Sequence, residues 1–547
     1  MRPATLRHAT CALRPAPCAL RPATCALAFL LIAAIACQIP GLIPPARPQT
    51  ATETPVAASP TAREPTRAPT SIPPTVIPTE LPAATAEVPS PPPSPTSVPT
   101  RTPALSPAPP LATPAPPSPT TVPPPPTSPP SGPIAVWEGT VTLNAYDWER
   151  ALVPTAPDDP VYPHPRLDFG AVGGPAPRAY RAVFIQNDYV QLVVLPELGG
   201  RILRWTDRTT GRQLFYANPV VKPTRWGYRG WWLATGGMEW AFPTEEHGLI
   251  EYRPWEYHLL GDGVYLRGVD DRTGLVVEVT VRLERGTNRI AVSPRISNPT
   301  AESRPFQFWA NGMLTLSDFN APSGDLTFVL PVSEVIVHST GDGSLPGPGG
   351  RMGWPVHNGR DFRRYGEWHS YLGVFAPQAA DAGFAGAYDL QTDQGVVRVA
   401  PSSIRGVKIF CLGDLPPDLW TDDGSRYFEL WGGLTATFWD YASLGPGRSV
   451  SWTEYWYAVS GMGGYTWANA EGAARVTPLG DGAEVAVETV RPMAVTVVLR
   501  RGNEEAARWS AEAGPGRPFR AVGGSGGGPW TLEVFGPQGL VLRAESP

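Results

Sequence analysis

Three side chains in the middle of the chain have types that suit proton transfer near neutral pH. Glu239 and His247 lie close together in sequence, and Glu429 lies far downstream in a strand-like run. A glutamate can take up a proton and a histidine can donate one in this pH range, so the set suits general acid–base catalysis. Other interpretations stay open: Glu429 can face solvent or pair with an arginine in a core, and His247, in a polar loop, can be an ordinary surface histidine.

Further side chains could hold a ligand beside this set. A tryptophan offers a flat apolar face with one polar edge, although tryptophans also fill cores, and the basic candidates could bind a ligand or pair with Glu197. Glu245, Glu246 and His247 are adjacent and lack the spacing of a metal site, so we predict no metal and no cofactor. The candidates for binding are Arg201, Glu239, Trp240, Trp309, Asn311, Lys408 and Trp431.

The elements that position these residues are predicted to be β-strands. In residues 276–283, valines and a leucine alternate with polar side chains, which places one face of a strand in a core and the other toward water. Turn signals such as Gly261-Asp-Gly263 separate this run from similar ones, and no long helical pattern occurs. We therefore expect an all-β protein of many antiparallel strands, and the period alone leaves sandwich and barrel architectures open.

Composition limits the partners and the covalent chemistry. The chain of 547 residues has a net charge of −5 and 17% charged residues, which argues against a nucleic-acid partner, because phosphate binding needs a concentrated basic surface. Only Cys411 lies outside the first 37 residues, in an apolar run. One cysteine forms neither an intrachain disulfide nor a thiolate zinc site, so Cys411 is interpreted as a small buried hydrophobe.

The amino-terminal part is predicted to stay outside the folded region. Residues 1–37 combine basic residues, an apolar run and an Ala34-Ile-Ala36 cleavage site, which is typical of an export signal, and Cys37 resembles the lipidated cysteine of bacterial lipoproteins. Residues 38–133 are rich in proline and lack aromatic residues, so they are expected to be a disordered, extended tether. The remainder is divided into a large β domain, residues 134–468, and a small β-sandwich module, residues 469–547.

Several segments of the large domain follow one another in a recognisable order. They are Leu195-Pro-Glu-Leu-Gly-Gly-Arg-Ile202, Gly236-Gly-Met-Glu-Trp-Ala-Phe-Pro243 with His247-Gly248, Asn298-Pro-Thr300, Phe308-Trp-Ala-Asn311, Gly406-Val-Lys-Ile-Phe-Cys-Leu-Gly413 and Arg426-Tyr-Phe-Glu-Leu-Trp-Gly-Gly433. The set resembles galactose-mutarotase-like domains and is similar to an uncharacterised bacterial domain family of that superfamily, found in carbohydrate-related proteins. The resemblance covers about Val136 to Ala468 and implies a β-supersandwich with a concave sugar-binding face.

The resemblance also implies roles for the acid–base set. In mutarotases a late glutamate takes the proton of the anomeric hydroxyl and a histidine protonates the ring oxygen, which opens the hexose ring. Glu429 and His247 match these two residues, Glu239 would bind a substrate hydroxyl, and the tryptophans would stack on the sugar ring. The family commonly has a second histidine beside the first, where this chain has Glu246; His258 is the alternative acid.

Two functions follow from this reading. The first is a sugar-processing enzyme, aldose-epimerase-like or acting on a glycan end, with a glutamate base and a histidine acid. The second is a non-catalytic polysaccharide-binding surface protein, so the sequence leaves open whether the chain is an enzyme. In both cases the expected partner is a carbohydrate, the only membrane contact is the lipid on Cys37, and the location is extracellular, at the surface of a bacterium.

Overall fold

The computed structural model of the chain describes residues 134–244 and 246–546. The predicted export signal, the lipidated Cys37 and the tether of residues 38–133 lie outside the described residues and stay predictions. Within the described ranges, no helix is both long and apolar enough to span a membrane. Apart from strands, these ranges contain α2 (Ala379–Ala382) and the short 3-10 helices η1 (Glu149–Ala151), η2 (Tyr365–Glu367) and η3 (Pro417–Leu419).

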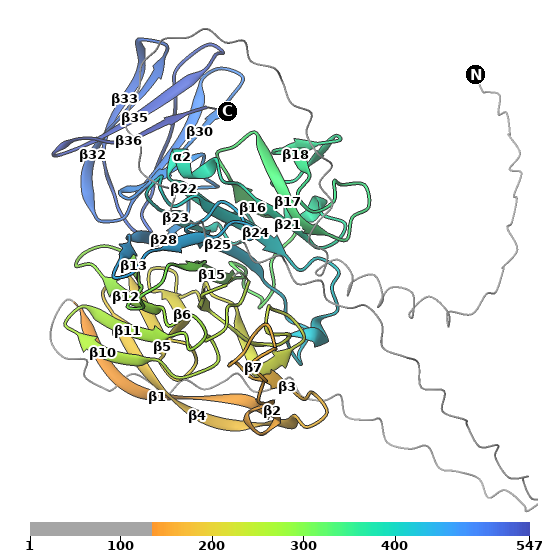
Figure 1. Cartoon of the computed structure of the whole chain (residues 1–547). Coiled ribbons are helices and arrows are strands. Elements are labelled where there is room, and N and C mark those ends of the chain that lie inside the picture. Colours follow the sequence, from red (N-terminus) through yellow and green to blue (C-terminus); the bar gives the residue numbers. More distant parts are fainter. Residues whose placement is uncertain (1–133, 245, 547) are drawn as a thin grey trace, which may run out of the picture. The chain divides into compact units, whose positions relative to one another are not determined.

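Two large sheets make up most of the fold (Figure 1). The first has 13 strands, which are, in spatial order, β18 (Arg351–Gly353), β17 (Glu334–Thr340), β21 (Leu372–Phe375), β24 (Gly406–Cys411), β25 (Phe428–Gly433), β15 (Trp309–Leu314), β9 (Met238–Ala241), β6 (Arg201–Asp207), β5 (Val190–Leu195), β4 (Gly173–Gln186), β1 (Ala135–Asp147), β7 (Ala217–Thr224) and β8 (Trp232–Gly236). The second has nine strands, which are β10 (Glu256–Leu260), β11 (Gly263–Val269), β12 (Val276–Leu283), β13 (Ile290–Ser297), β28 (Glu454–Ser460), β23 (Gln394–Val399), β22 (Phe384–Asp389) and β16 (Leu326–Val329), with β27 (Ser449–Ser451) paired to β13.

The remaining strands form small sheets. Three pairs connect parts of the large sheets: β2 (Leu152–Val153) with β3 (Arg166–Leu167), β14 (Arg304–Phe306) with β26 (Ala442–Leu444), and β19 (Val356–His357) with β20 (Arg360–Asp361). At the carboxyl end, one four-stranded sheet contains β29 (Trp467–Asn469), β30 (Gly472–Pro478), β31 (Ala483–Thr489) and β34 (Phe519–Gly523). The other contains β33 (Glu504–Ala513), β32 (Met493–Arg501), β35 (Trp530–Gly536) and β36 (Gly539–Glu545).

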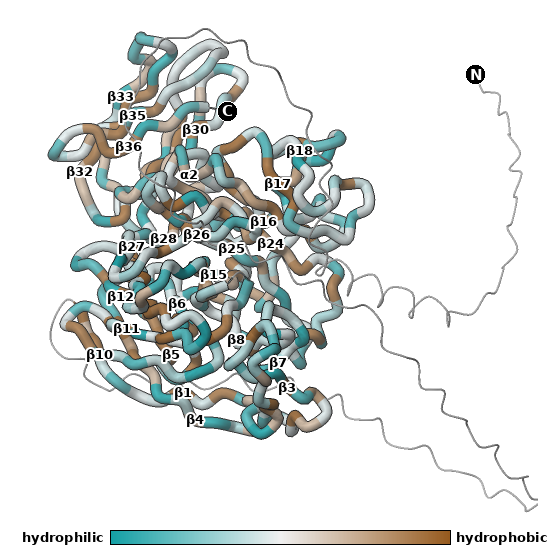
Figure 2. Tube along the Cα trace, viewed as in Figure 1, coloured by the Kyte–Doolittle hydropathy of each residue, from teal (hydrophilic) through white to brown (hydrophobic). Residues whose placement is uncertain are grey.

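The two large sheets face each other across one hydrophobic core. Val183 and Ile185 of β4 and Val277 and Val279 of β12 are all 0% exposed and belong to the same cluster of buried side chains. β12 buries alternate residues, as period-two patterning requires when one face packs and the other does not. β4 instead buries Ala182 to Ile185 in succession, because its other face packs in a second cluster of buried side chains. The hydropathy of the trace accordingly changes from residue to residue along many strands (Figure 2). This arrangement confirms the expected all-β supersandwich.

The carboxyl-terminal strands, blue in Figure 1, form the small β-sandwich that the sequence predicts. Val485 and Val497, from its two sheets, are 0% exposed and share one cluster of buried side chains. A second cluster joins this module to the nine-stranded sheet, because Ala486 of β31 packs in the same group as Tyr388 and Tyr457. The module therefore has its own core and an apolar contact with the large sandwich.

A buried ion pair lies within the nine-stranded sheet. Arg398 of β23 donates to Glu454 Oε2 of β28 from Nη2 at 2.6 Å and from Nε at 3.1 Å, and both side chains are 2% exposed. The guanidinium packs against Gly432 of β25 in the opposite sheet, where a Cβ atom would lie 2.1 Å from Nε of Arg398. The glycine thus leaves the space that the pair needs between the sheets.

Glu488 of β31 links the carboxyl-terminal module to the large sandwich. Its carboxylate accepts the main-chain N–H groups of Ser460 at 2.7 Å and Gly516 at 2.8 Å. Burial raises the pKa of Glu488 to about 8, and the negative charges of Asp207 and Asp393 add to this effect. The folded state therefore holds a proton that the unfolded state releases near pH 4.5. We expect the free energy of unfolding, measured by denaturant titration, to fall as pH rises from 4.5 to 8.

The variant Glu488→Gln should flatten this dependence, because the amide cannot titrate. Glu484→Gln, on the same strand, is the control: its pKa is lowered by the neighbouring Arg520, so its titration falls below this window and the slope should match the wild type. Equal slopes for Glu488→Gln and the wild type would contradict the assignment.

Candidate functional site

Five of the residues predicted for the site lie along one face of the 13-stranded sheet. Its neighbouring strands place Lys408 opposite Trp431, Trp431 opposite Asn311, and Asn311 opposite Glu239. Directly paired residues point to the same side of a sheet, so these side chains form one row across β24, β25, β15 and β9. Glu429, two residues before Trp431 in the chain, points the same way. The residues that alternate with them belong to the core between the sheets.

A turn of two glycines brings another tryptophan onto this row. Gly236, the last residue of β8, and Gly237, which precedes β9, have φ of 81° and 78°, in the left-handed region that favours glycine. A Cβ atom at either position would lie within 2.3 Å of a main-chain carbonyl oxygen. The turn places Trp232 of β8 beside Glu239 of β9, where the indole Nε1–H donates to Oε2 at 2.8 Å.

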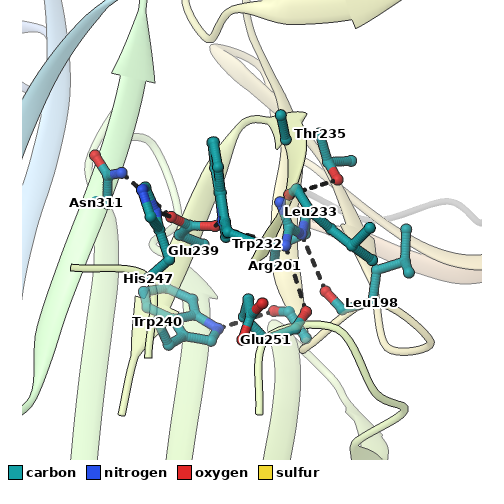
Figure 3. A network of polar contacts seen from close by, with 12 residues as sticks. Leu198, Arg201, Trp232, Leu233, Thr235, Glu239, Trp240, His247, Glu251 and Asn311 are labelled. Atoms are coloured by element: carbon teal, nitrogen blue, oxygen red, sulfur yellow. Dashed lines mark hydrogen bonds and ion pairs between the residues drawn. The ribbon is translucent and has the colours of Figure 1, made fainter. Parts of the chain in front are cut away.

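Glu239 and His247 form a buried ion pair (Figure 3). The Nδ1–H of His247 donates to Oε1 of Glu239 at 2.6 Å, and the imidazole stacks on Trp232 with ring centroids 3.7 Å apart. Burial alone would raise the pKa of Glu239, but His247 and Arg201 hold that pKa below its ordinary value. Burial alone would lower the pKa of His247, but Glu239 raises that pKa above its ordinary value. His247 therefore stays a cation to higher pH, with Nε2 as the nitrogen that can act on a ligand.

Arg201 supports Glu239 from behind the row. Its side chain is 1% exposed, and Nη2 lies 3.5 Å from Oε2 of Glu239. The guanidinium also donates to two main-chain carbonyl oxygens, at 3.1 and 3.3 Å (Figure 3). Glu197, the alternative partner in the sequence analysis, instead accepts the main-chain N–H of Arg181. Arg201 thus neutralises the Glu239 carboxylate and is not among the residues that line the pocket described below.

The carboxylate of Glu429 is held by three neighbours. The Nε1–H of Trp431 donates to Oε2 at 2.7 Å, and Nζ of Lys408 lies 3.9 Å from the same oxygen. The amide nitrogen of Asn311 lies 3.5 Å from Oε1 and also 3.3 Å from Oε1 of Glu239, so it links the two carboxylates. Burial raises the pKa of Glu429 above its ordinary value, although the neighbouring cations act against this.

A pocket with about 710 Å³ of free space, its open mouth included, lies over this row. It brings together His247, Lys408, Glu429 and Trp431 among the residues expected from the sequence, while Glu239 and Asn311 lie directly behind them. Its walls are mostly aromatic and apolar. The lining residues that the sequence analysis did not propose for the site are Trp226, Trp232, Glu246, His338, Ser339, Tyr371, Phe410, Leu412, Leu415 and Tyr427.

Two of the tryptophans expected to stack on a ligand lie elsewhere. Trp240 follows Glu239 in an extended strand and therefore points to the opposite face, where it is 0% exposed in the core between the sheets. Trp309 is on the pocket side of the sheet but is also 0% exposed, because Phe438 covers it with ring centroids 4.8 Å apart. The structure corrects the expectation for both: they pack the fold, and of the three only Trp431 reaches the pocket.

The arrangement can transfer protons to and from a bound ligand. His247 is the histidine beside Glu429, whereas His258, the alternative acid, lies on β10 of the other large sheet with its ring against Tyr265. In the described part of the chain, no three His, Cys, Asp or Glu side chains gather as a metal site. Cys411 is fully buried, and burial raises the pKa of its thiol well above the ordinary value. Glu429 and His247, the expected base and acid, thus line the same pocket.

Solved structures that match part of this chain come from several bacteria. A TPR-domain containing protein from Parabacteroides distasonis ATCC 8503 is 22% identical with a TM-score of 0.51, over 60% of this chain and 55% of that chain. This chain thus spans about half the length of that protein. A galactose mutarotase related enzyme from Lactobacillus acidophilus is 12% identical with a TM-score of 0.37, over 51% of this chain and 97% of that chain. A galactose mutarotase-like protein from Lactobacillus casei ATCC 334 is 10% identical with a TM-score of 0.34, over 51% and 99%.

The family comparison covers the pocket and most of both large sheets. The matching family model carries the description "Domain of unknown function (DUF5107)" and spans residues 157–459. The matched range is more than half of the chain and contains every residue of the row and of the pocket described above. The resemblance to an uncharacterised domain family that the sequence motifs predict is thus confirmed. The chain belongs to the DUF5107 family.

Proposed function

We propose that the pocket binds a carbohydrate and interconverts its anomers, in the manner of an aldose epimerase. The observation that carries this proposal is that the side chains of Glu429 and His247 line one pocket. Glu429 takes the proton of the anomeric hydroxyl while Nε2 of His247 protonates the ring oxygen, so the C1–O5 bond breaks. Rotation about C1–C2 and the reverse transfers close the ring as the other anomer.

The walls of the pocket suit such a ligand. A pyranose has apolar faces of C–H groups and an equator of hydroxyls, which matches aromatic walls with few polar groups. Trp431 offers both, since its ring borders the pocket while its Nε1–H holds Glu429. Lys408 and Glu429 line the same wall, where they can form hydrogen bonds with the sugar hydroxyls. We further propose that the protein is exported and held at a bacterial surface through a lipid on Cys37.

The pH dependence follows from the two pKa shifts. The base must be ionised, so activity is lost below the pKa of Glu429, which burial places above its ordinary value of 4.5. The acid must be protonated, so activity is lost above the pKa of His247, which Glu239 raises above its ordinary value of 6.5 against the effect of burial. We expect a bell-shaped profile of kcat/KM whose acid limb lies above pH 4.5 and whose alkaline limb lies above pH 6.5.

Polarimetry of freshly dissolved α-D-glucose, α-D-galactose and related free sugars measures this reaction directly, with the full chain and with heat-denatured protein as the blank. Faster equilibration than the blank, with both limbs in the stated ranges, supports the proposal. Calorimetric sugar binding without any acceleration would replace it with the second function, a non-catalytic carbohydrate-binding protein. Absence of both binding and acceleration would contradict a carbohydrate function for the pocket.

A further inference from the structure

One tryptophan near the pocket is exposed where the others are covered. Trp439, in the loop between β25 and β26, is 51% exposed, and it is the only tryptophan among residues 134–244 and 246–546 with so large a surface in solvent. Exposing an indole gives up the free energy that burial would provide. Single exposed apolar residues occur on most proteins, so the position of this one decides its meaning.

Hydrogen bonds hold the main chain of the loop around Trp439 in place. The carboxylate of Asp440 accepts the N–H and the hydroxyl of Thr437 at 3.0 and 2.8 Å, and the same hydroxyl oxygen accepts the N–H of Trp439 at 3.1 Å. The buried side chain of Gln307 donates to the carbonyl oxygens of Phe438 and Asp440 at 2.8 and 2.7 Å. A ligand that stacks on Trp439 would therefore meet a pre-organised surface and lose little of its binding energy to ordering the loop.

The indole is continuous with a wall of the pocket. Its ring stacks against His338 with centroids 6.3 Å apart and 27° between planes, and it meets Phe375 edge-on at 5.3 Å. His338 itself lines the pocket. The residue before the indole, Phe438, contacts the ammonium group of Lys408, another lining residue, at 4.5 Å from the ring centroid. An aromatic surface thus runs from the pocket over His338 to Trp439 in solvent.

We propose that Trp439 is a second sugar-binding position and that the ligand of this protein is an oligosaccharide. The terminal residue of the glycan occupies the pocket, and the apolar face of the next residue stacks on the exposed face of the indole. This inference rests on the proposed carbohydrate function and adds the substrate class. A free monosaccharide would fill the pocket and leave Trp439 unused, whereas a glycan chain must leave the pocket across its rim.

Calorimetry on the full chain tests the inference with α- and β-linked gluco- and galacto-oligosaccharides of increasing length, from the monosaccharide upward. In the series that binds, affinity should rise by about tenfold between the monosaccharide and the longer members, the scale of one good aromatic contact. Trp439→Ala should abolish that rise while monosaccharide affinity stays within about twofold of wild type. Trp439→Phe should keep part of the rise, and Trp509→Ala, on β33 of the carboxyl-terminal module, should keep all of it.

The outcomes separate the inference from the function on which it rests. If monosaccharides bind and longer glycans bind no better, or if the gain with length survives in Trp439→Ala, the second position is wrong and the sugar pocket stands. Equal weakening of short and long ligands in Trp439→Ala would show that the indole only supports His338, which also overturns the inference. If no saccharide of any length binds the wild type, the proposed function itself fails.

Discussion

Glu429→Gln is expected to lower kcat for anomer interconversion by about a hundredfold to ten-thousandfold, the usual contribution of a positioned general base. The amide keeps the size of the side chain. Its oxygen can still accept the Nε1–H of Trp431, which in the wild type donates to the carboxylate at 2.7 Å. It cannot take up the proton of the anomeric hydroxyl. Sugar affinity, measured by calorimetry, should therefore change far less than the rate measured by polarimetry.

A matched change on the other large sheet controls for the loss of a negative charge. Glu278→Gln on β12 removes a carboxylate that bonds Tyr265, far from the row that carries the site, so its rate should equal that of the wild type. If Glu429→Gln kept the wild-type rate, the base would have to be another group, and the mechanism proposed above would be wrong.

Glu239→Gln is expected to have two large effects at once. Its carboxylate lies within 3.5 Å of donor groups from Arg201, Trp232, His247 and Asn311, and it is 1% exposed. Removing one partner of a buried ion pair costs about 3–5 kcal/mol, because the remaining cations stay buried without compensation. The pKa of His247 should also fall, since among the carboxylates that raise it against burial Glu239 has the largest effect. The alkaline limb of the pH profile should therefore move to lower pH.

Glu454→Gln separates these two effects. It breaks the buried pair with Arg398 within the nine-stranded sheet, so denaturant titration should show a comparable loss of unfolding free energy. Its alkaline limb should match that of the wild type, since Glu454 is not among the groups that shift the pKa of His247. An alkaline limb that stays in place in Glu239→Gln would refute the electrostatic role assigned to this carboxylate.

Much of the fold and part of the site could be predicted from the sequence for identifiable physical reasons. Period-two patterning indicates directly which face of a strand packs. The all-β class and the strand at residues 276–283 could therefore be predicted from the sequence. The same parity places Trp240 opposite Glu239, so its position in the core follows from adjacency within one strand. Ordered motifs supplied Glu429 and His247, because their types and neighbours are local features of the chain.

The rest of the site depends on contacts between distant segments. Trp309 shares its face with Asn311, and only the return of Phe438 over it removes it from the pocket. His338 alternates with buried valines in β17, but its place at the pocket follows from the order of strands in the sheet, which no local pattern encodes. Of the pocket residues that the sequence motifs did not indicate, Trp232 was the easiest to predict, since it lies shortly before the two glycines of a motif that the sequence analysis used.

The alternation along β17, β21 and β24 also separates the residues that stabilise the core from those that line the pocket. Val337, Val374 and Ile409 face the core, while neighbouring residues such as His338 and Phe410 line the pocket. If the pocket binds a glycan as proposed, substitutions at the second set would change which glycan is recognised without opening a cavity in the core. Family members that differ at these alternate positions would then have diverged in ligand while keeping one architecture, and a combinatorial library confined to them would sample new specificities on an undisturbed framework.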